Sequence, residues 1–317
     1  MVSLRPAGAR ISLREIAART GISDDDVARL WRAFGLPEAA PDDPVAYEQS
    51  ADVFALFQIG IEQFGVDTGL QLTRLVGEVT ARLADAIVSS FIVAIGGPAS
   101  RRDATLVELA EANSQTAALF PSFVHAIDLL LRHHLEVARR PLAEVIPETL
   151  GSYETRQIAI GFADLTGSTA LAGRVTFAEL GSVLGDFEAR SADVVNRGGG
   201  RVVKLIGDEV MFAVPTVAAA CEIACALVET IDAHGALPPV RVGIAGGGVL
   251  ARYGDLFGPV VNLAARLVAQ AEPRTVLAPA AIAREIEATG TFTPNAFGAV
   301  SLRGFDDDVE IVRVTRS

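Results

Sequence analysis

The sequence predicts two domains, an all-helical domain at 1–140 and an α+β domain at 157–317, joined by a linker at 141–156. Its 317 residues are enough for two domains of ordinary size. In the first part, apolar residues recur every three or four positions, as they do in amphipathic helices. In the second part, short apolar runs alternate with helical stretches, and Pro141 and Pro147 interrupt the pattern between the two parts.

The helical domain begins with the outline of a helix-turn-helix motif. Ser12 and Ser23 are typical helix N-caps, Glu15 completes a capping box, and Gly21 marks the turn. The second helix, however, begins with three aspartates at 24–26, which suit the helix dipole but repel DNA phosphates. The net charge of −12 argues in the same direction. We therefore interpret this segment as a helical packing module, expect no nucleic-acid partner, and disfavour a transcription regulator.

Further helices are expected at 47–65, 68–95, 104–119 and 123–140. The most apolar window, residues 86–97, is too short for a typical membrane-spanning helix. The N-terminal arginines are not followed by the apolar core of a secretory signal. We therefore expect a cytoplasmic protein without a membrane span.

Three of the four histidines, His125, His133 and His134, fall in the last predicted helix before the linker. One interpretation is that they are ordinary residues of a polar helix face. The other is a pH response, because histidine titrates near neutrality and its protonation can shift the packing of domains. The sequence leaves both open, together with a small-molecule effector.

The second domain has the order of elements of a ferredoxin-like fold. A β-like run at 157–164 precedes a helix at 177–197 and a hairpin at 201–214. A helix at 217–233 and a strand at 240–249 then complete a β-α-β-β-α-β series. The elements expected after this core are a helix at 258–271, a strand at 275–278, a helix at 280–288, and strands at 300–302 and 310–314.

Two aspartates stand where strands give way to turns. Asp164 closes an apolar run and opens the small-residue turn that follows, and Asp208 sits between the two strands of the hairpin. Alone, each aspartate would more often be a turn-former or a helix cap. Together, beside a loop rich in backbone N–H groups, they favour a site for hard cations and polyphosphate.

A third segment runs from Asp255 to Arg266 and reads DLFGPVVNLAAR. Asn262 and Arg266 are four positions apart and therefore share one face of the predicted helix. Together with the two aspartate segments, this segment resembles the catalytic domain of class III nucleotide cyclases, the adenylyl and guanylyl cyclases. The resemblance covers about the last half of the chain and implies the same ferredoxin-like fold.

The resemblance also implies roles for individual residues. Asp164 and Asp208 match the two aspartates that bind two divalent cations, Mg²⁺ or Mn²⁺, with assistance from the Leu165 carbonyl. The other implied roles are phosphate binding by the turn of Thr166, Gly167, Ser168 and Thr169, ribose orientation by Asn262, stabilisation of α-phosphate charge by Arg266, and binding of the terminal phosphates by Arg303.

Lys204 and Asp255 bear on the choice of base. Adenine presents an acceptor at N1 and a donor at its N6 amine, so a lysine donor and an aspartate acceptor are complementary to it. Family members that make cyclic GMP usually carry Glu and Cys at these places. Each residue alone could be a surface lysine or a turn residue, but their coincidence favours ATP as substrate over GTP.

Lys204 and Asp208 belong to one short hairpin, although base and triphosphate lie at opposite ends of ATP. We therefore expect a homodimer with two shared sites. In each site one subunit supplies Asp164 and Asp208, and the other supplies Lys204, Asp255, Asn262 and Arg266.

The resemblance thus predicts an adenylyl cyclase that converts ATP to cyclic AMP. More weakly, the helical domain resembles the regulatory domains that precede cyclase domains in some actinobacterial enzymes. A catalytically inactive cyclase fold that acts as a nucleotide sensor or interaction protein is the alternative, which the complete residue set opposes. The sequence around Asp208 is only a partial match to a diguanylate cyclase signature.

Overall fold

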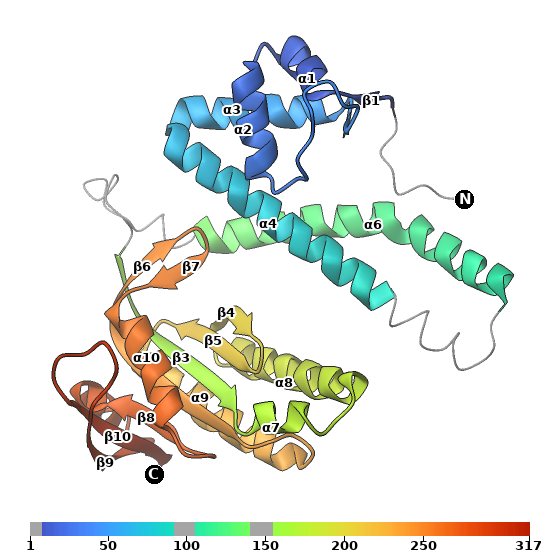
Figure 1. Ribbon diagram of the computed structural model, residues 1–317. Coiled ribbons are helices and arrows are strands. Elements are labelled where there is room, and N and C mark those ends of the chain that lie inside the picture. The colour runs from blue at the N-terminus through green and yellow to red at the C-terminus, as the bar shows by residue number, and fades with distance from the viewer. Residues whose placement is uncertain (1–7, 92–104, 140–154) are drawn as a thin grey trace. The chain divides into compact units, whose positions relative to one another are not determined.

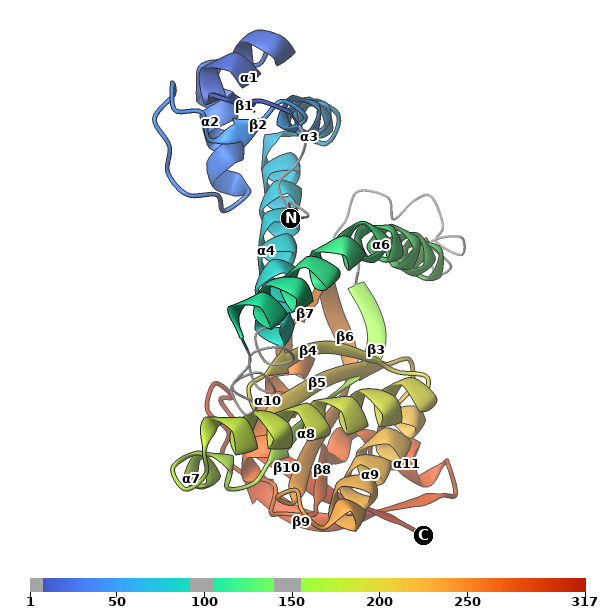
Figure 2. The same ribbon diagram turned by 90° about the vertical axis from the view of Figure 1, so that its right-hand side faces the viewer.

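The computed structural model describes residues 8–91, 105–139 and 155–317. The chain divides into two compact units, Met1–Leu150 and Gly151–Ser317 (Figures 1 and 2). Most of the predicted linker lies outside the described residues, and the first strand of the second unit already begins at Thr155. No helix of the described ranges has both the length and the apolarity that a membrane crossing requires.

Helices make up most of the described part of the first unit, as the sequence predicts. They are α1 (Leu13–Thr20), α2 (Asp24–Ala33), α3 (Ser50–Phe64), α4 (Val66–Phe91) and α6 (Leu106–Arg139). A two-residue antiparallel ladder between β1 (Arg10–Ile11) and β2 (Ala46–Tyr47) is an addition that the helical pattern did not indicate.

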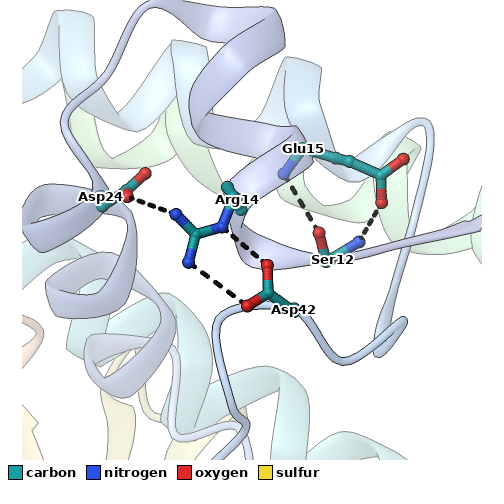
Figure 3. Close-up of polar contacts among 5 residues, drawn as sticks. All are labelled: Ser12, Arg14, Glu15, Asp24 and Asp42. Carbon is teal, nitrogen blue, oxygen red and sulfur yellow. Dashed lines mark hydrogen bonds and ion pairs between the residues drawn. The ribbon is translucent and has the colours of Figure 1, made fainter.

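Polar contacts fix the start of the helix-turn-helix segment (Figure 3). The Ser12 hydroxyl accepts a hydrogen bond from the Glu15 N–H at 3.2 Å, and the Ser12 N–H donates to Glu15 at 2.8 Å, which completes the predicted capping box. Arg14 pairs with Asp42 at 2.7 Å and with Asp24 at 3.8 Å. Asp26 pairs with Arg29 at 3.0 Å, so two of the three aspartates that begin α2 are engaged within this unit.

An aromatic cluster forms the core behind these helices. Trp31 of α2 stacks on Phe54 of α3 with ring centroids 6.4 Å apart, and Phe34 meets Phe54 edge-on at 5.5 Å. The Trp31 indole N–H donates to the Pro37 carbonyl at 2.7 Å, which satisfies the polar end of this buried ring. The apolar face of α2 thus serves packing within the unit.

The break predicted between helices 104–119 and 123–140 is wrong. A single helix, α6, runs through Pro121. A proline inside a helix removes one backbone hydrogen bond and strains the preceding turn, but it does not always end the helix. The helix-forming residues on both sides of Pro121 carry α6 across it. His125, His133 and His134 all lie in the second half of α6 and are exposed.

The second unit is built on an eight-stranded sheet with the order β4-β5-β3-β6-β8-β10-β9, in which β7 pairs with β6. The order β4-β5-β3-β6, with all neighbours antiparallel, is that of the predicted ferredoxin-like core. Strand β8 adds to it in parallel with β6. The strands are β3 (Thr155–Leu165), β4 (Arg201–Ile206), β5 (Glu209–Val214), β6 (Val240–Arg252), β7 (Asp255–Phe257), β8 (Val276–Pro279), β9 (Phe292–Val300) and β10 (Val309–Arg316).

The two faces of the sheet carry different helices, because side chains along a strand alternate between faces. Ala163 and Leu165 of β3 pack in the core with α8 (Phe177–Arg197) and α9 (Val217–His234). Ile160 and Phe162 pack instead under α10 (Pro259–Gln270). Figure 2 shows α8 and α9 on the same side of the sheet, and Figure 1 shows α10 across β3 and β6. The alternation of β3 therefore assigns Asp164, two residues beyond Phe162, to the α10 face.

Several elements of the second unit depart from the sequence prediction. The strand predicted at 300–302 is wrong, because β9 ends at Val300, and β9 itself was missed. It contains Pro294 and Gly298, which disfavour a strand but are tolerated at the edge of a sheet, where β9 lies. Strand β7 and the short helix α7 (Ser168–Ala172) were also not predicted as such.

Helix α10 approaches the sheet most closely at Gly243 of β6. A Cβ atom at this position would lie 2.3 Å from the backbone nitrogen of Val268 and 2.6 Å from the carbonyl oxygen of Ala264. We expect Gly243→Ala to force α10 away from β6 and to lower the free energy of unfolding by about 1–3 kcal/mol. Thermal unfolding measures this effect as a lower Tm.

Gly185→Ala in α8 is the matched control, because a Cβ atom there meets open space. We expect it to raise stability by up to about 1 kcal/mol, the usual difference between alanine and glycine within a helix. A Gly243→Ala variant that melts at or above the wild-type temperature would contradict the close approach of α10.

Candidate active site

The end of β3 presents Asp164 next to a tight turn. The following residue, Leu165, is buried, and Thr166 donates both its N–H and its hydroxyl to the Pro239 carbonyl at 2.8 Å. Gly167 then adopts a positive φ of 78° and caps the short helix α7. These contacts hold the strand end, so that Asp164 is fixed at the start of the turn.

Asp208 lies beside Asp164 in the turn of the β4–β5 hairpin. Gly207, with a φ of 65°, allows this turn to form. The Leu165 N–H donates to the Asp208 carbonyl at 3.1 Å, and the Ser168 hydroxyl donates to the Asp208 carboxylate. The structure therefore brings together the two aspartates that the sequence singled out.

Two further charged residues lie in the same row of the sheet, and sequence reasoning missed both. In the strand register Asp164 stands opposite Glu209 of β5 on one side and opposite Arg241 of β6 on the other. The Arg241 guanidinium contacts the Asp164 carboxylate at 2.7 Å. The site thus contains three carboxylates, Asp164, Asp208 and Glu209, and one arginine.

Burial controls the protonation of these acids. It raises the pKa of Asp164, whereas the hydrogen bond and the positive charge of Arg241 lower it. Burial also raises the pKa of Glu209, to about 7, and the neighbouring charges of Asp164 and Asp208 add to this effect. Burial is the main cause in both cases, the nearby carboxylates add to it, and a bound cation would favour the charged form of these acids.

The donor set fits a cation that is shared with phosphate. Among the described residues, no three histidine, cysteine or acidic side chains are grouped so that they could hold a metal ion by themselves. Asp164 and Asp208 are adjacent and only partly buried, and each is a hard oxygen donor. Mg²⁺ in phosphate-binding sites is typically held by one or two carboxylates together with substrate oxygens and water. The two aspartates match that pattern.

Lys204 and Asp255 form a second group. The Lys204 ammonium contacts both carboxylate oxygens of Asp255, at 3.0 and 2.7 Å, and joins the edge strand β4 to β7. The Leu256 N–H donates to the Asp255 carboxylate at 2.8 Å and helps to fix its orientation. With about a third of each side chain exposed, 37% for Lys204 and 33% for Asp255, the pair is open to a ligand.

Asn262 and Arg266 form the third group, on the outer face of α10. Both residues are exposed, whereas Ala264, Leu267 and Val268 of the same helix are buried. The Arg266 guanidinium is held at 3.3 Å by the backbone carbonyl of Arg303, which brings the predicted phosphate-binding arginine near this helix. Arg303 is itself exposed. The helix thus presents an amide and a guanidinium away from its own sheet.

Two family profiles match this chain, one in each of its two units. The profile described as the adenylate and guanylate cyclase catalytic domain matches residues 150–314, which is more than half of the chain. The chain belongs to this cyclase family. The profile described as the adenylate cyclase regulatory domain matches residues 4–137. This chain is therefore a class III cyclase of the adenylate cyclase type, an enzyme whose catalytic domain follows a regulatory domain.

Individual proteins are similar along nearly the whole chain. Rv2212, a protein of Mycobacterium tuberculosis, is 39% identical over 300 residues, which are 94% of this chain and 77% of that protein. An adenylate cyclase of Glutamicibacter nicotianae is 33% identical over 314 residues, covering 93% and 76%. The pH-sensitive adenylate cyclase MT1302 of M. tuberculosis is 29% identical over 324 residues, covering 98% and 79%.

Proposed function

We propose that this cyclase converts ATP to 3′,5′-cyclic AMP and pyrophosphate. The observation that carries the proposal is the Lys204–Asp255 pair, a donor and an acceptor held together and open to a ligand in the domain that also contains the paired aspartates. A lysine donor suits adenine N1 and an aspartate acceptor suits the adenine amine. The similar protein of G. nicotianae, named an adenylate cyclase, supports the same substrate.

In this reaction the ribose 3′-oxygen forms a bond to the α-phosphorus, and the bond from that phosphorus to the pyrophosphate oxygen breaks. We assign Asp164 and Asp208, with the Leu165 carbonyl, to holding two divalent cations, Mg²⁺ or Mn²⁺. When bound, such cations neutralise the triphosphate and lower the pKa of the attacking hydroxyl. The two carboxylates would fix the positions of the cations, because hydrogen bonds of the strand end and the turn hold both carboxylates in place.

The remaining residues position the nucleotide. Arg266 stabilises negative charge on the α-phosphate and Asn262 orients the ribose, since both point outward from one face of α10. Arg303 takes the terminal phosphates. In the turn, the N–H and hydroxyl of Thr166 bond to Pro239 and the Ser168 hydroxyl bonds to Asp208, so phosphate binding there falls to the backbone N–H groups of Gly167, Ser168 and Thr169.

We infer that the active enzyme is a homodimer with two shared sites. Lys204 and Asp208 come from the same hairpin, and Asn262 and Arg266 face away from the sheet that carries Asp164. One subunit then supplies the paired aspartates, and its partner supplies Lys204, Asp255 and the α10 residues. Any movement that alters how the two catalytic domains face each other would change the rate.

The helical unit is proposed to regulate this alignment, with pH as the candidate signal. His125, His133 and His134 are exposed on α6, and histidine is the residue type most often used as a pH switch. The similar protein MT1302 is named pH-sensitive. These observations support a pH response through α6.

The decisive assay is formation of cyclic AMP from ATP and Mn²⁺ by the full chain, with Asp164→Ala as the inactive control. We expect product from the wild type at a rate at least about 100-fold above that of the control. A folded dimer that binds ATP without forming product would favour the inactive nucleotide sensor.

The same assay, run from acidic to neutral pH, tests regulation. It compares the wild type with a variant in which all three histidines are changed to Gln. An unchanged pH–activity curve would reject the histidine hypothesis.

A further inference from the structure

Arg241 makes the most specific contact in the aspartate group. It lies near the start of β6, directly opposite Asp164 in the antiparallel register. Its Nε and Nη2 atoms both contact Oδ2 of Asp164, at 2.8 and 2.7 Å. The pair is partly buried, with 29% of the arginine side chain and 16% of the aspartate side chain exposed. Two charge-assisted contacts to one oxygen make this a strong interaction.

The guanidinium has a second attachment. Its Nη1 atom donates to the carbonyl of Ala269 at 3.1 Å, near the end of α10. Arg241 would therefore stay beside the site if its contacts with Asp164 were broken. The pair also differs in burial from a surface pair such as Arg313–Glu272, because the side chain of Glu272 is two-thirds exposed.

Arg241 bonds to the same carboxylate that the proposed function assigns to a divalent cation. A cation that uses Oδ2 of Asp164 must replace the Nε hydrogen bond and the Nη2 ion-pair contact on that oxygen. A cation that uses the other oxygen still lies close to a positive guanidinium, and like charges at such distances repel each other. In either case the arginine and the cation compete for one negative charge.

We propose that Arg241 is a positioning residue that competes with the divalent cation for Asp164, so that cation binding must loosen the Arg241–Asp164 pair. This inference rests on the proposed function, because it takes Asp164 as a cation ligand. Its consequence is that the chain holds its cation less tightly than its carboxylates alone would allow. Loosening the pair also leaves Arg241 attached to α10, the helix that carries Asn262 and Arg266.

Binding of Mn²⁺ alone, followed by electron paramagnetic resonance on the full chain without nucleotide, tests the inference. We expect Arg241→Gln to bind Mn²⁺ roughly tenfold more tightly than the wild type, because the competing charge and donors are removed. Arg241→Lys, which keeps the charge but cannot repeat the paired contact, should lie between the two. Arg313→Gln removes an equal charge from another strand of the same sheet and should behave as the wild type.

Asp164→Asn distinguishes a failure of the proposed competition from a failure of the proposed cation site. If this variant loses Mn²⁺ binding while Arg241→Gln binds no more tightly than the wild type, the competition is wrong and the cation site stands. If Asp164→Asn binds Mn²⁺ as well as the wild type, Asp164 is not a ligand, and the metal assignment of the proposed function fails together with this inference. Should Arg241→Gln fold poorly, Arg241→Lys gives the same decision.

Discussion

Mixing two inactive variants is expected to restore activity. Asp208→Ala removes a proposed cation ligand, and Arg266→Ala removes the proposed α-phosphate contact, so each alone should lower kcat by at least about 100-fold. In a heterodimer of the two, one of the two sites combines the intact Asp208 of one subunit with the intact Arg266 of the other. If subunits exchange at random, half of the dimers are mixed and about a quarter of the wild-type activity should return. Cyclic AMP formation before and after subunit exchange measures this recovery.

The matched control is a mixture of Asp208→Ala with Asp164→Ala. Both residues belong to the same half of the proposed shared site, since hydrogen bonds of the β3 end and the β4–β5 turn place them side by side. Every dimer in that mixture carries a broken cation site at both positions, and no recovery is expected. Mixed dimers of the first pair that are shown to have exchanged subunits and yet stay inactive would mean that each site is built from one chain.

The elements that frame the site follow from local sequence signals. Helix α8 was predicted at 177–197 and spans Phe177–Arg197, because Thr176 and Glu179 form a capping box at its start and glycines follow its end. The hairpin of β4 and β5 follows from two apolar runs around the Gly207–Asp208 turn. Signals of this kind depend only on residues that are close in the sequence, so they can be read from a single sequence.

What the sequence could not show depends on contacts between distant residues. Arg241 at a strand start looks like a solvated strand end, and only the pairing of β3 with β6 brings it onto Asp164, 77 positions away. Glu209 looks like an ordinary turn residue until burial beside two aspartates raises its pKa to about 7. The sequence alone therefore could not predict which charged residues surround the two aspartates. The roles of all the predicted site residues stay predictions.

The second large effect is expected at the proposed base-binding pair, Lys204 and Asp255. Changing Lys204 to Glu and Asp255 to Cys together replaces the adenine-type donor and acceptor by the residues that usually accompany guanine in this family. We expect kcat/KM for ATP to fall roughly 100-fold or more, because a buried or half-buried polar group without its partner discriminates strongly between ligands. The measurement is kcat/KM for ATP and for GTP on the same preparation.

The ratio of the two substrates separates base recognition from damage to the fold. In the wild type, Lys204 and Asp255 satisfy each other at 2.7 Å, so a variant that removes only one of them leaves a charge about one-third exposed and unpaired in the pocket. Such a loss could lower activity toward every nucleotide. The double change replaces the lysine ammonium at position 204 by a carboxylate, which is an acceptor for guanine N–H groups, and removes the Asp255 charge, so the preference should move toward GTP. An equal fall for ATP and GTP, with an unaltered preference, would show that this pair supports the β4–β7 contact and does not read the base.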